Sequence, residues 1–115
     1  MKISVQSFDA WRIVAMEGKF VLKHFAQIKK VLGSLEQTEG PLVALDFSGL
    51  THMDSSAITL IVNYRQKLAS KNGKLVLFGA NNDITGILSM VGLDLAVPVF
   101  KTAGDFELGV RMNNI

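Results

Sequence analysis

Polar and apolar residues alternate over positions 2–8, which is the pattern of a strand with one buried face. A short turn at Asp9-Ala10 separates this segment from a second predicted strand, Trp11–Met16, and the two strands therefore form a hairpin. From residue 21 the apolar residues recur every three or four positions, which is the spacing of one face of an amphipathic helix. The residues on that face are Val21, Phe25, Ile28, Leu32 and Leu35.

A continuous apolar segment at residues 42–47 is typical of a strand that is covered on both faces within a parallel sheet. We expect residues 48–53 to form a loop and a second helix to occupy residues 55–71, starting at Asp54 or Ser55. The same rules predict four later elements: a strand at 74–79, a helix capped by Asn81 or Asn82, an edge strand at 96–100 and a helix after Thr102.

Strands that alternate with helices after an opening hairpin predict an α/β fold. We expect residues 1–115 to form a single domain. Its mixed sheet should consist of the hairpin followed by parallel strands, with about four helices packed against it. Loops that leave the carboxyl ends of the strands form the usual binding edge of such sheets, and residues 48–53 are expected to be one of these loops.

Composition narrows the classes of function that this chain can have. It has no cysteine, which excludes disulfides and thiolate metal sites. Its twelve basic and ten acidic residues are scattered, without a basic cluster interleaved with aromatic residues, so we expect no nucleic-acid partner. The apolar runs are too short for a leader or a membrane span, which predicts a cytoplasmic protein with no membrane insertion.

The segment that can carry chemistry is Asp54-Ser55-Ser56, at the expected start of the second helix. In one interpretation Asp54 or Ser55 caps the helix and Ser56 simply occupies its first turn. In the other, Ser56 is a phosphoacceptor, because the free N–H groups of a helix N-terminus can accommodate a phosphate. A phosphate would add about −1.5 to −2 charges at neutral pH and would act on whatever protein docks there.

Catalysis by the same segment is a weaker hypothesis. His52, Asp54 and a neighbouring serine are the residue types of an acyl-transfer triad, but triad members normally come from separated segments and no Gly-x-Ser-x-Gly elbow occurs. No phosphate-binding glycine motif occurs either. We expect His24 to be a solvated residue of the first helix. The sequence therefore predicts no catalytic residue, no cofactor and no metal.

The string Leu-Asp-Phe-Ser-Gly-Leu-Thr-His-Met-Asp-Ser-Ser-Ala, residues 45–57, resembles the signature of STAS domains, especially those of bacterial anti-sigma factor antagonists. The likeness covers nearly the whole chain, including residues 17–20, 73–77 and 88–94. It implies a STAS-like fold. It also implies partner switching, in which the antagonist binds an anti-sigma factor with serine kinase activity and so releases a sigma factor.

In that family the kinase phosphorylates the second serine of an Asp-Ser-Ser-Gly motif, which maps to Ser56, and a phosphatase resets it. Ser56 is thus the expected phosphoacceptor of a protein that is itself not an enzyme. The residues expected to contact the partner are His52, Asp54, Ser55, Ser56, Ala57 and Thr59. We expect a monomer or a weak dimer.

Two positions depart from the family pattern. Ala57 replaces the usual glycine after the second serine, and Val21 occupies a place where many members carry aspartate. Both departures favour an alternative function, an accessory STAS subunit that binds an ATPase component of a transport system without phosphorylation. A third hypothesis is the binding of a nucleotide or other small molecule at the strand ends.

Overall fold

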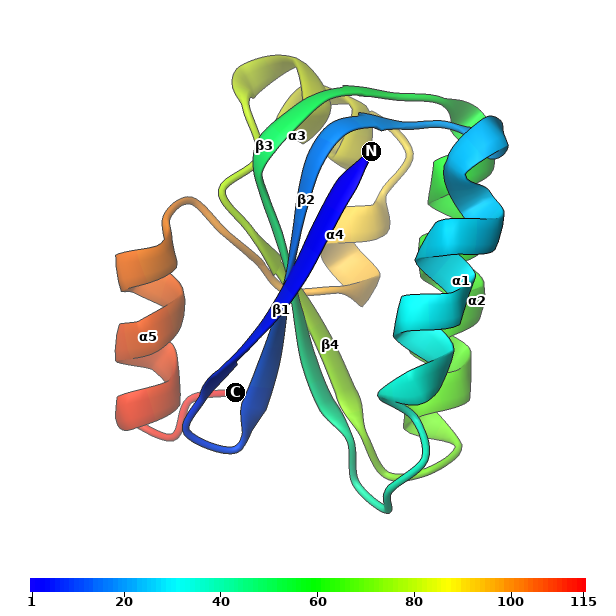
Figure 1. Ribbon diagram of the computed structural model, residues 1–115. Helices are drawn as coiled ribbons and strands as arrows, with labels where there is room; N and C mark the ends of the chain where they lie inside the picture. Colours follow the sequence, from blue (N-terminus) through cyan, green and yellow to red (C-terminus); the bar gives the residue numbers. More distant parts are fainter.

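The computed structural model describes residues 1–115 and contains one five-stranded mixed sheet (Figure 1). Strands β1 (Lys2–Phe8) and β2 (Trp11–Phe20) pair antiparallel as the predicted hairpin. The later strands, β3 (Leu42–Met53), β4 (Lys74–Phe78) and β5 (Val99–Phe100), are parallel to β2 and to one another, in the spatial order β1-β2-β3-β4-β5. The predicted α/β class and mixed sheet are confirmed.

Helices cover the sheet on both faces. Their bounds are Leu22–His24 for the short 3₁₀ helix η1, Phe25–Ser34 for α1, Ser55–Ala69 for α2, Asn82–Met90 for α3, Leu93–Ala96 for α4 and Ala103–Arg111 for α5. Helices α1 and α2 lie side by side on one face, and α5 lies on the other (Figure 1). The sequence predicts about four helices, and the additional one is the single turn α4.

Alternate residues of the central strands enter two separate cores. Twenty-one buried residues fill the larger core, between the sheet and the layer of helices α1–α4. The smaller core has five buried residues and is centred on Phe106 of α5, whose ring stacks on that of Phe78 with centroids 5.1 Å apart. Within β4, Leu77 faces the larger core and Phe78 the smaller one, as the pleat of a strand covered on both faces requires.

Residues 48–53 form the end of β3 and not the predicted loop. Strand β2 extends to Phe20, which pairs with Met53, so β3 continues for six residues after Phe47, and four of these pair with β2. The pairing has two register shifts, one between Ala15 and Glu17 and one between Gly18 and Lys19, and it resumes after each of them. As a result, only Asp54 separates the end of β3 from the first turn of α2.

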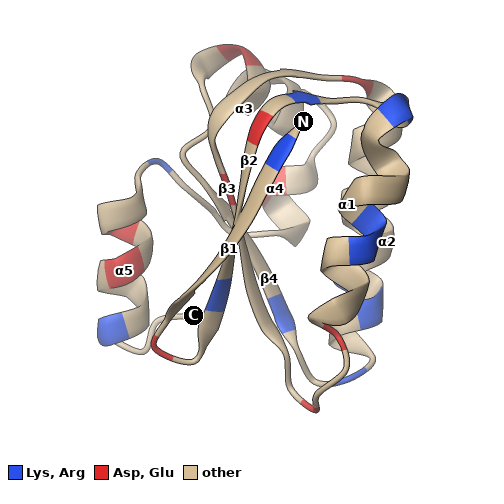
Figure 2. Cartoon of the chain, in the orientation of Figure 1, with Lys and Arg blue, Asp and Glu red and all other residues tan.

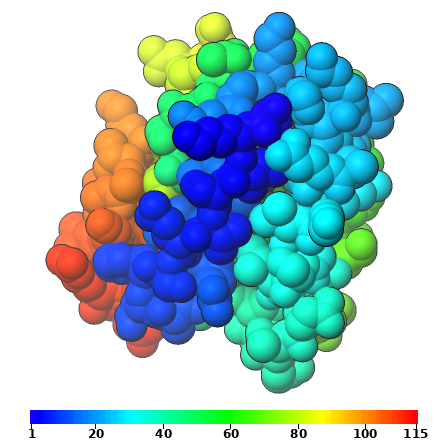
Figure 3. Space-filling model, viewed as in Figure 1, coloured from blue at the N-terminus to red at the C-terminus, as the bar shows by residue number.

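The predicted edge strand at residues 96–100 is also shorter than expected. Ala96 ends α4, and only Val99 and Phe100 pair with β4. Val97 turns its side chain into the larger core, and this burial takes priority over continued pairing. Strand β5 does lie at the edge of the sheet, as the presence of Pro98 predicts. At the opposite edge β1 is on the surface (Figure 3), and most of its residues are exposed.

Candidate functional site

The site is built where β3 ends and α2 begins. Asp54 has an extended backbone and caps α2, with its Oδ1 accepting a hydrogen bond from the backbone N–H of Ala57 at 3.1 Å. The same oxygen accepts a hydrogen bond from the Ser56 hydroxyl at 2.6 Å. This geometry follows from local chemistry, because an aspartate at the N-cap satisfies N–H groups that the helix leaves free. It orients the hydroxyl of Ser56 within the first turn.

Asp54 also joins two segments that are far apart in sequence. Its Oδ2 accepts a hydrogen bond at 3.3 Å from the backbone N–H of Leu22, 32 residues earlier. Its own N–H donates to the carbonyl of Phe20, also at 3.3 Å. Val21, which starts η1, contributes no capping side chain. Asp54, the residue after β3, therefore supplies a side-chain acceptor for the first N–H of η1.

The surroundings of Asp54 favour its charged form. Its pKa lies below the ordinary 3.8, first because the Ser56 hydroxyl donates to it, and then because the N–H groups of Ala57 and Leu22 do so. Partial desolvation opposes these hydrogen bonds without cancelling them. The carboxylate therefore remains a negatively charged acceptor next to Ser56 at neutral pH.

Replacement of Asp54 should make the stability of the protein less dependent on pH. Because its folded pKa is depressed, Asp54 stabilises the fold above its ordinary pKa of 3.8, and this contribution is lost as the pH falls through the folded value. At pH 7 we expect the midpoint of thermal unfolding of Asp54→Asn to lie several degrees below that of the native protein, since one amide oxygen cannot replace both carboxylate oxygens. The difference should shrink as the pH falls below the ordinary pKa of 3.8, where the unfolded chain binds a proton, and disappear below the folded pKa of native Asp54. Thermal unfolding followed by circular dichroism at pH 7 and pH 3 measures both effects, and an equal difference at the two pH values would contradict them.

The predicted partner-binding residues do not all share one surface. His52, Ser55 and Thr59 are exposed, while Asp54 and Ser56 are half-buried. The prediction that Ala57 contacts a partner is wrong. Its methyl group is fully buried in the larger core beneath the first turn of α2, so it offers no contact to another protein. A methyl group at this position fills space inside the protein and does not obstruct the outer face of the site.

His24 also differs from the expectation that it is a solvated residue of the first helix. It is half-buried and lies in η1, one residue before α1. Partial desolvation, followed by the positive charges of the N-terminal amine and Lys23, lowers the pKa of its imidazole. The prediction that His24 belongs to the first amphipathic helix is wrong, because the chain makes a 3₁₀ turn at residues 22–24 and the α-helix begins only at Phe25.

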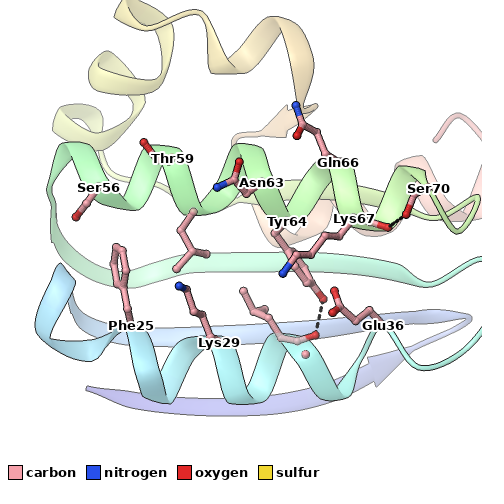
Figure 4. Close-up of a pocket in the computed structure, with 13 residues that line it drawn as sticks. Phe25, Lys29, Glu36, Ser56, Thr59, Asn63, Tyr64, Gln66, Lys67 and Ser70 are labelled. Carbon is pink, nitrogen blue, oxygen red and sulfur yellow. Dashed lines mark hydrogen bonds between the residues drawn. The ribbon is translucent and has the colours of Figure 1, made fainter.

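Ser56 opens onto a groove between α1 and α2, which sequence analysis did not predict (Figure 4). The groove has a volume of about 640 Å³ and is lined on the α1 side by Phe25 and Lys29 and on the α2 side by Ser56, Tyr64 and Lys67. No sequence pattern indicates it, because the residues of its two walls are 20 to 45 positions apart along the chain and only tertiary packing brings them together.

Tyr64 holds the two walls of the groove together. Its hydroxyl donates to the backbone carbonyl of Leu32 at 2.9 Å and so connects the middle of α2 to α1. Burial, reinforced by the negative charge of Glu36, raises the pKa of this hydroxyl well above its ordinary value of 10. Tyr64 therefore remains a neutral donor at any physiological pH, and the spacing of the two helices does not depend on pH through this bond.

The two helices that form the groove carry only positive charges. Lys29 and Lys30 lie in α1, Arg65 and Lys67 lie in α2, and neither helix contains an aspartate or glutamate (Figure 2). The protein has no group of three or more His, Asp or Glu side chains that could hold a metal ion. None of its helices is both long enough and apolar enough to cross a membrane.

Fold and sequence together assign the chain to a family. The family model of the STAS domain matches residues 2–106, and the chain therefore belongs to the STAS domain family. This confirms the resemblance found in residues 45–57, and the sheet and helices have the arrangement of known STAS structures.

Similar proteins include regulators and parts of transporters. An anti-sigma-B factor antagonist of Listeria monocytogenes is 22% identical over 81 residues, which are 70% of this chain and 71% of the relative. The crystal structure of an anti-sigma factor antagonist from Mycobacterium paratuberculosis has a TM-score of 0.85 at 18% identity and covers 96% of this chain and 93% of its own. A SulP transporter STAS domain from Vibrio cholerae has a TM-score of 0.72 at 20% identity, with 95% and 88% covered.

Proposed function

We propose that this protein is a cytoplasmic anti-sigma factor antagonist whose binding is controlled by phosphorylation of Ser56. In its unmodified form it binds an anti-sigma factor with serine kinase activity and so releases a sigma factor. The kinase then phosphorylates Ser56 and ends the complex, and a phosphatase restores it. The observation that carries this proposal is the accessible hydroxyl of Ser56, held at 2.6 Å from Asp54 in the first turn of α2.

The geometry supports a switch that leaves the fold standing. Asp54 keeps two backbone donors, the N–H groups of Ala57 and Leu22, when the Ser56 hydroxyl is no longer available to it. A phosphate on Ser56 would lie next to the Asp54 carboxylate, and the two negative charges would repel each other. The modified side chain therefore moves away from Asp54, and a dianion appears next to the exposed residues Ser55 and Thr59.

Phosphorylation by the cognate kinase tests this proposal directly. Incubation of the protein with the anti-sigma factor kinase and ATP should add one phosphate, which mass spectrometry of proteolytic peptides should place on Ser56. Ser56→Ala should accept none, whereas Ser55→Ala, with the neighbouring exposed hydroxyl removed, should be modified as fast as the native protein. Phosphate on Ser55 or on no residue of the 54–57 segment would overturn the assignment.

A second candidate function is an accessory STAS subunit that binds an ATPase component of a transport system. The observation that favours it is Val21, which gives the start of η1 no side-chain hydrogen bond and offers no polar contact to a kinase. A pull-down from the source cell distinguishes the two. Recovery of an ATP-binding transporter subunit supports the second function, and recovery of an anti-sigma kinase supports the first.

A further inference from the structure

We propose that the groove between α1 and α2 is the binding site for the phosphate of modified Ser56 and that Lys29 of α1 is its cationic partner. This inference rests on the proposed function, since it concerns the phosphorylated protein. Ser56, Phe25 and Lys29 line the same end of the groove, and Figure 4 shows all three side chains pointing into the space between the helices. Ser56, whose hydroxyl is bonded to Asp54 in the unmodified protein, therefore lines the same space that Lys29 enters from α1.

The charges around Ser56 determine where a phosphate moves. Asp54 contacts the hydroxyl from the start of the helix, and its negative charge repels a phosphate. Lys29 faces the groove from α1 and is not engaged by a carboxylate, because the only ion pair of the protein joins Lys2 to Glu17. Repulsion on one side and attraction on the other drive the phosphate from Asp54 into the groove.

Two other charged side chains line the groove, and both lie farther along it. Lys67 is eleven residues after Ser56 on α2, which corresponds to about 16 Å along the helix axis. Glu36 is near Tyr64, whose pKa it raises, and this too is away from the Ser56 end. Of the two lysines that line the groove, Lys29 is therefore the one at the Ser56 end.

Pairing of the phosphate with Lys29 changes the shape of the protein surface as well as its charge. A phosphate held by an ammonium group forms short, charge-assisted hydrogen bonds. It would lie over the ring of Phe25 and fill the end of the groove that is open in the unmodified protein. A partner that inserts a side chain there is excluded by occupation of the groove, in addition to repulsion at the exposed start of α2.

The experiment uses the full chain with phosphoserine incorporated at position 56 during translation, so that no kinase is needed. The second pKa of the phosphate, ordinarily about 6, is measured by ³¹P NMR in the native background, in Lys29→Gln and in Lys30→Gln. Lys30 is the matched control, because its loss changes the net charge equally although it does not line the groove. A nearby cation favours the dianion, so Lys29→Gln should raise this pKa by about 0.5 to 1 unit and Lys30→Gln by much less.

Lys29→Arg provides the second test, because it keeps the charge on a side chain of similar reach. Lys29→Arg should keep the low phosphate pKa of the native background. This result would show that the higher pKa in Lys29→Gln comes from the lost charge and not from a general change in structure. Identical titrations in Lys29→Gln and Lys30→Gln would overturn the inference. Because the phosphate is installed without a kinase, failure of this test leaves the proposed function intact, and failure of the kinase assay leaves this measurement valid.

Discussion

Ser56→Asp should keep the fold of the protein and weaken its binding to the anti-sigma factor by about 100-fold. A carboxylate at this position carries a negative charge into the proposed interface, and a charge that the binding partner leaves unpaired in an interface costs about 2–5 kcal/mol. Because about 1.4 kcal/mol corresponds to a tenfold change, the stated 100-fold loss corresponds to about 2.8 kcal/mol, in the lower half of this range. Isothermal titration calorimetry with the purified anti-sigma factor measures it.

Two variants separate the effect of position from the effect of charge. Ser56→Ala removes the hydroxyl without adding charge and should bind as the native protein does. Ser55→Asp adds the same charge at the neighbouring exposed residue, which does not line the groove, and should cost less affinity. Native-like binding by Ser56→Asp, with an unchanged circular dichroism spectrum, would contradict a switch at this serine.

Gly73→Ala should destabilise the protein by about 3 kcal/mol, the upper part of the usual range for overpacking. Gly73 lies between the end of α2 and the start of β4, where a Cβ atom would be 2.3 Å from the carbonyl oxygen of Pro41 and 2.9 Å from that of Leu68. Both oxygens also accept backbone hydrogen bonds, from Lys74 and from Gly73 itself. Neither carbonyl can withdraw without moving β3 or α2, the two elements that position Ser56.

Gly86→Ala is the matched control for this substitution. Gly86 lies inside α3 and has open space where its Cβ would be. Alanine is the better helix former, so this variant should be more stable than the native protein by about 0.5–1 kcal/mol. Urea denaturation followed by circular dichroism compares the two variants. A Gly73→Ala protein as stable as Gly86→Ala would show that the close approach of Pro41 does not constrain the fold.

Features that depend on residues close to one another in sequence were predictable from the sequence. The opening hairpin follows from strict alternation around a short turn, and the structure has it. The starts of α2, α3 and α5 follow from capping side chains that bond a backbone N–H three residues later, at Asp54, Asn81 and Thr102. Ser56 was located for the same reason, since its place in the first turn of α2 is set by the cap two residues before it.

Features that join distant segments were decided by the tertiary structure alone. β3 continues to Met53 because β2 offers it a partner, and Asp54 bonds the N–H of Leu22 because the two strand ends lie side by side. The groove that Ser56 faces exists because Tyr64 ties α2 to α1. A periodic pattern of residues shows which face of an element is buried, but it does not show what packs against that face. The sequence by itself therefore determined where Ser56 lies in its helix, and the packing of α1 determined which charges line the groove next to it.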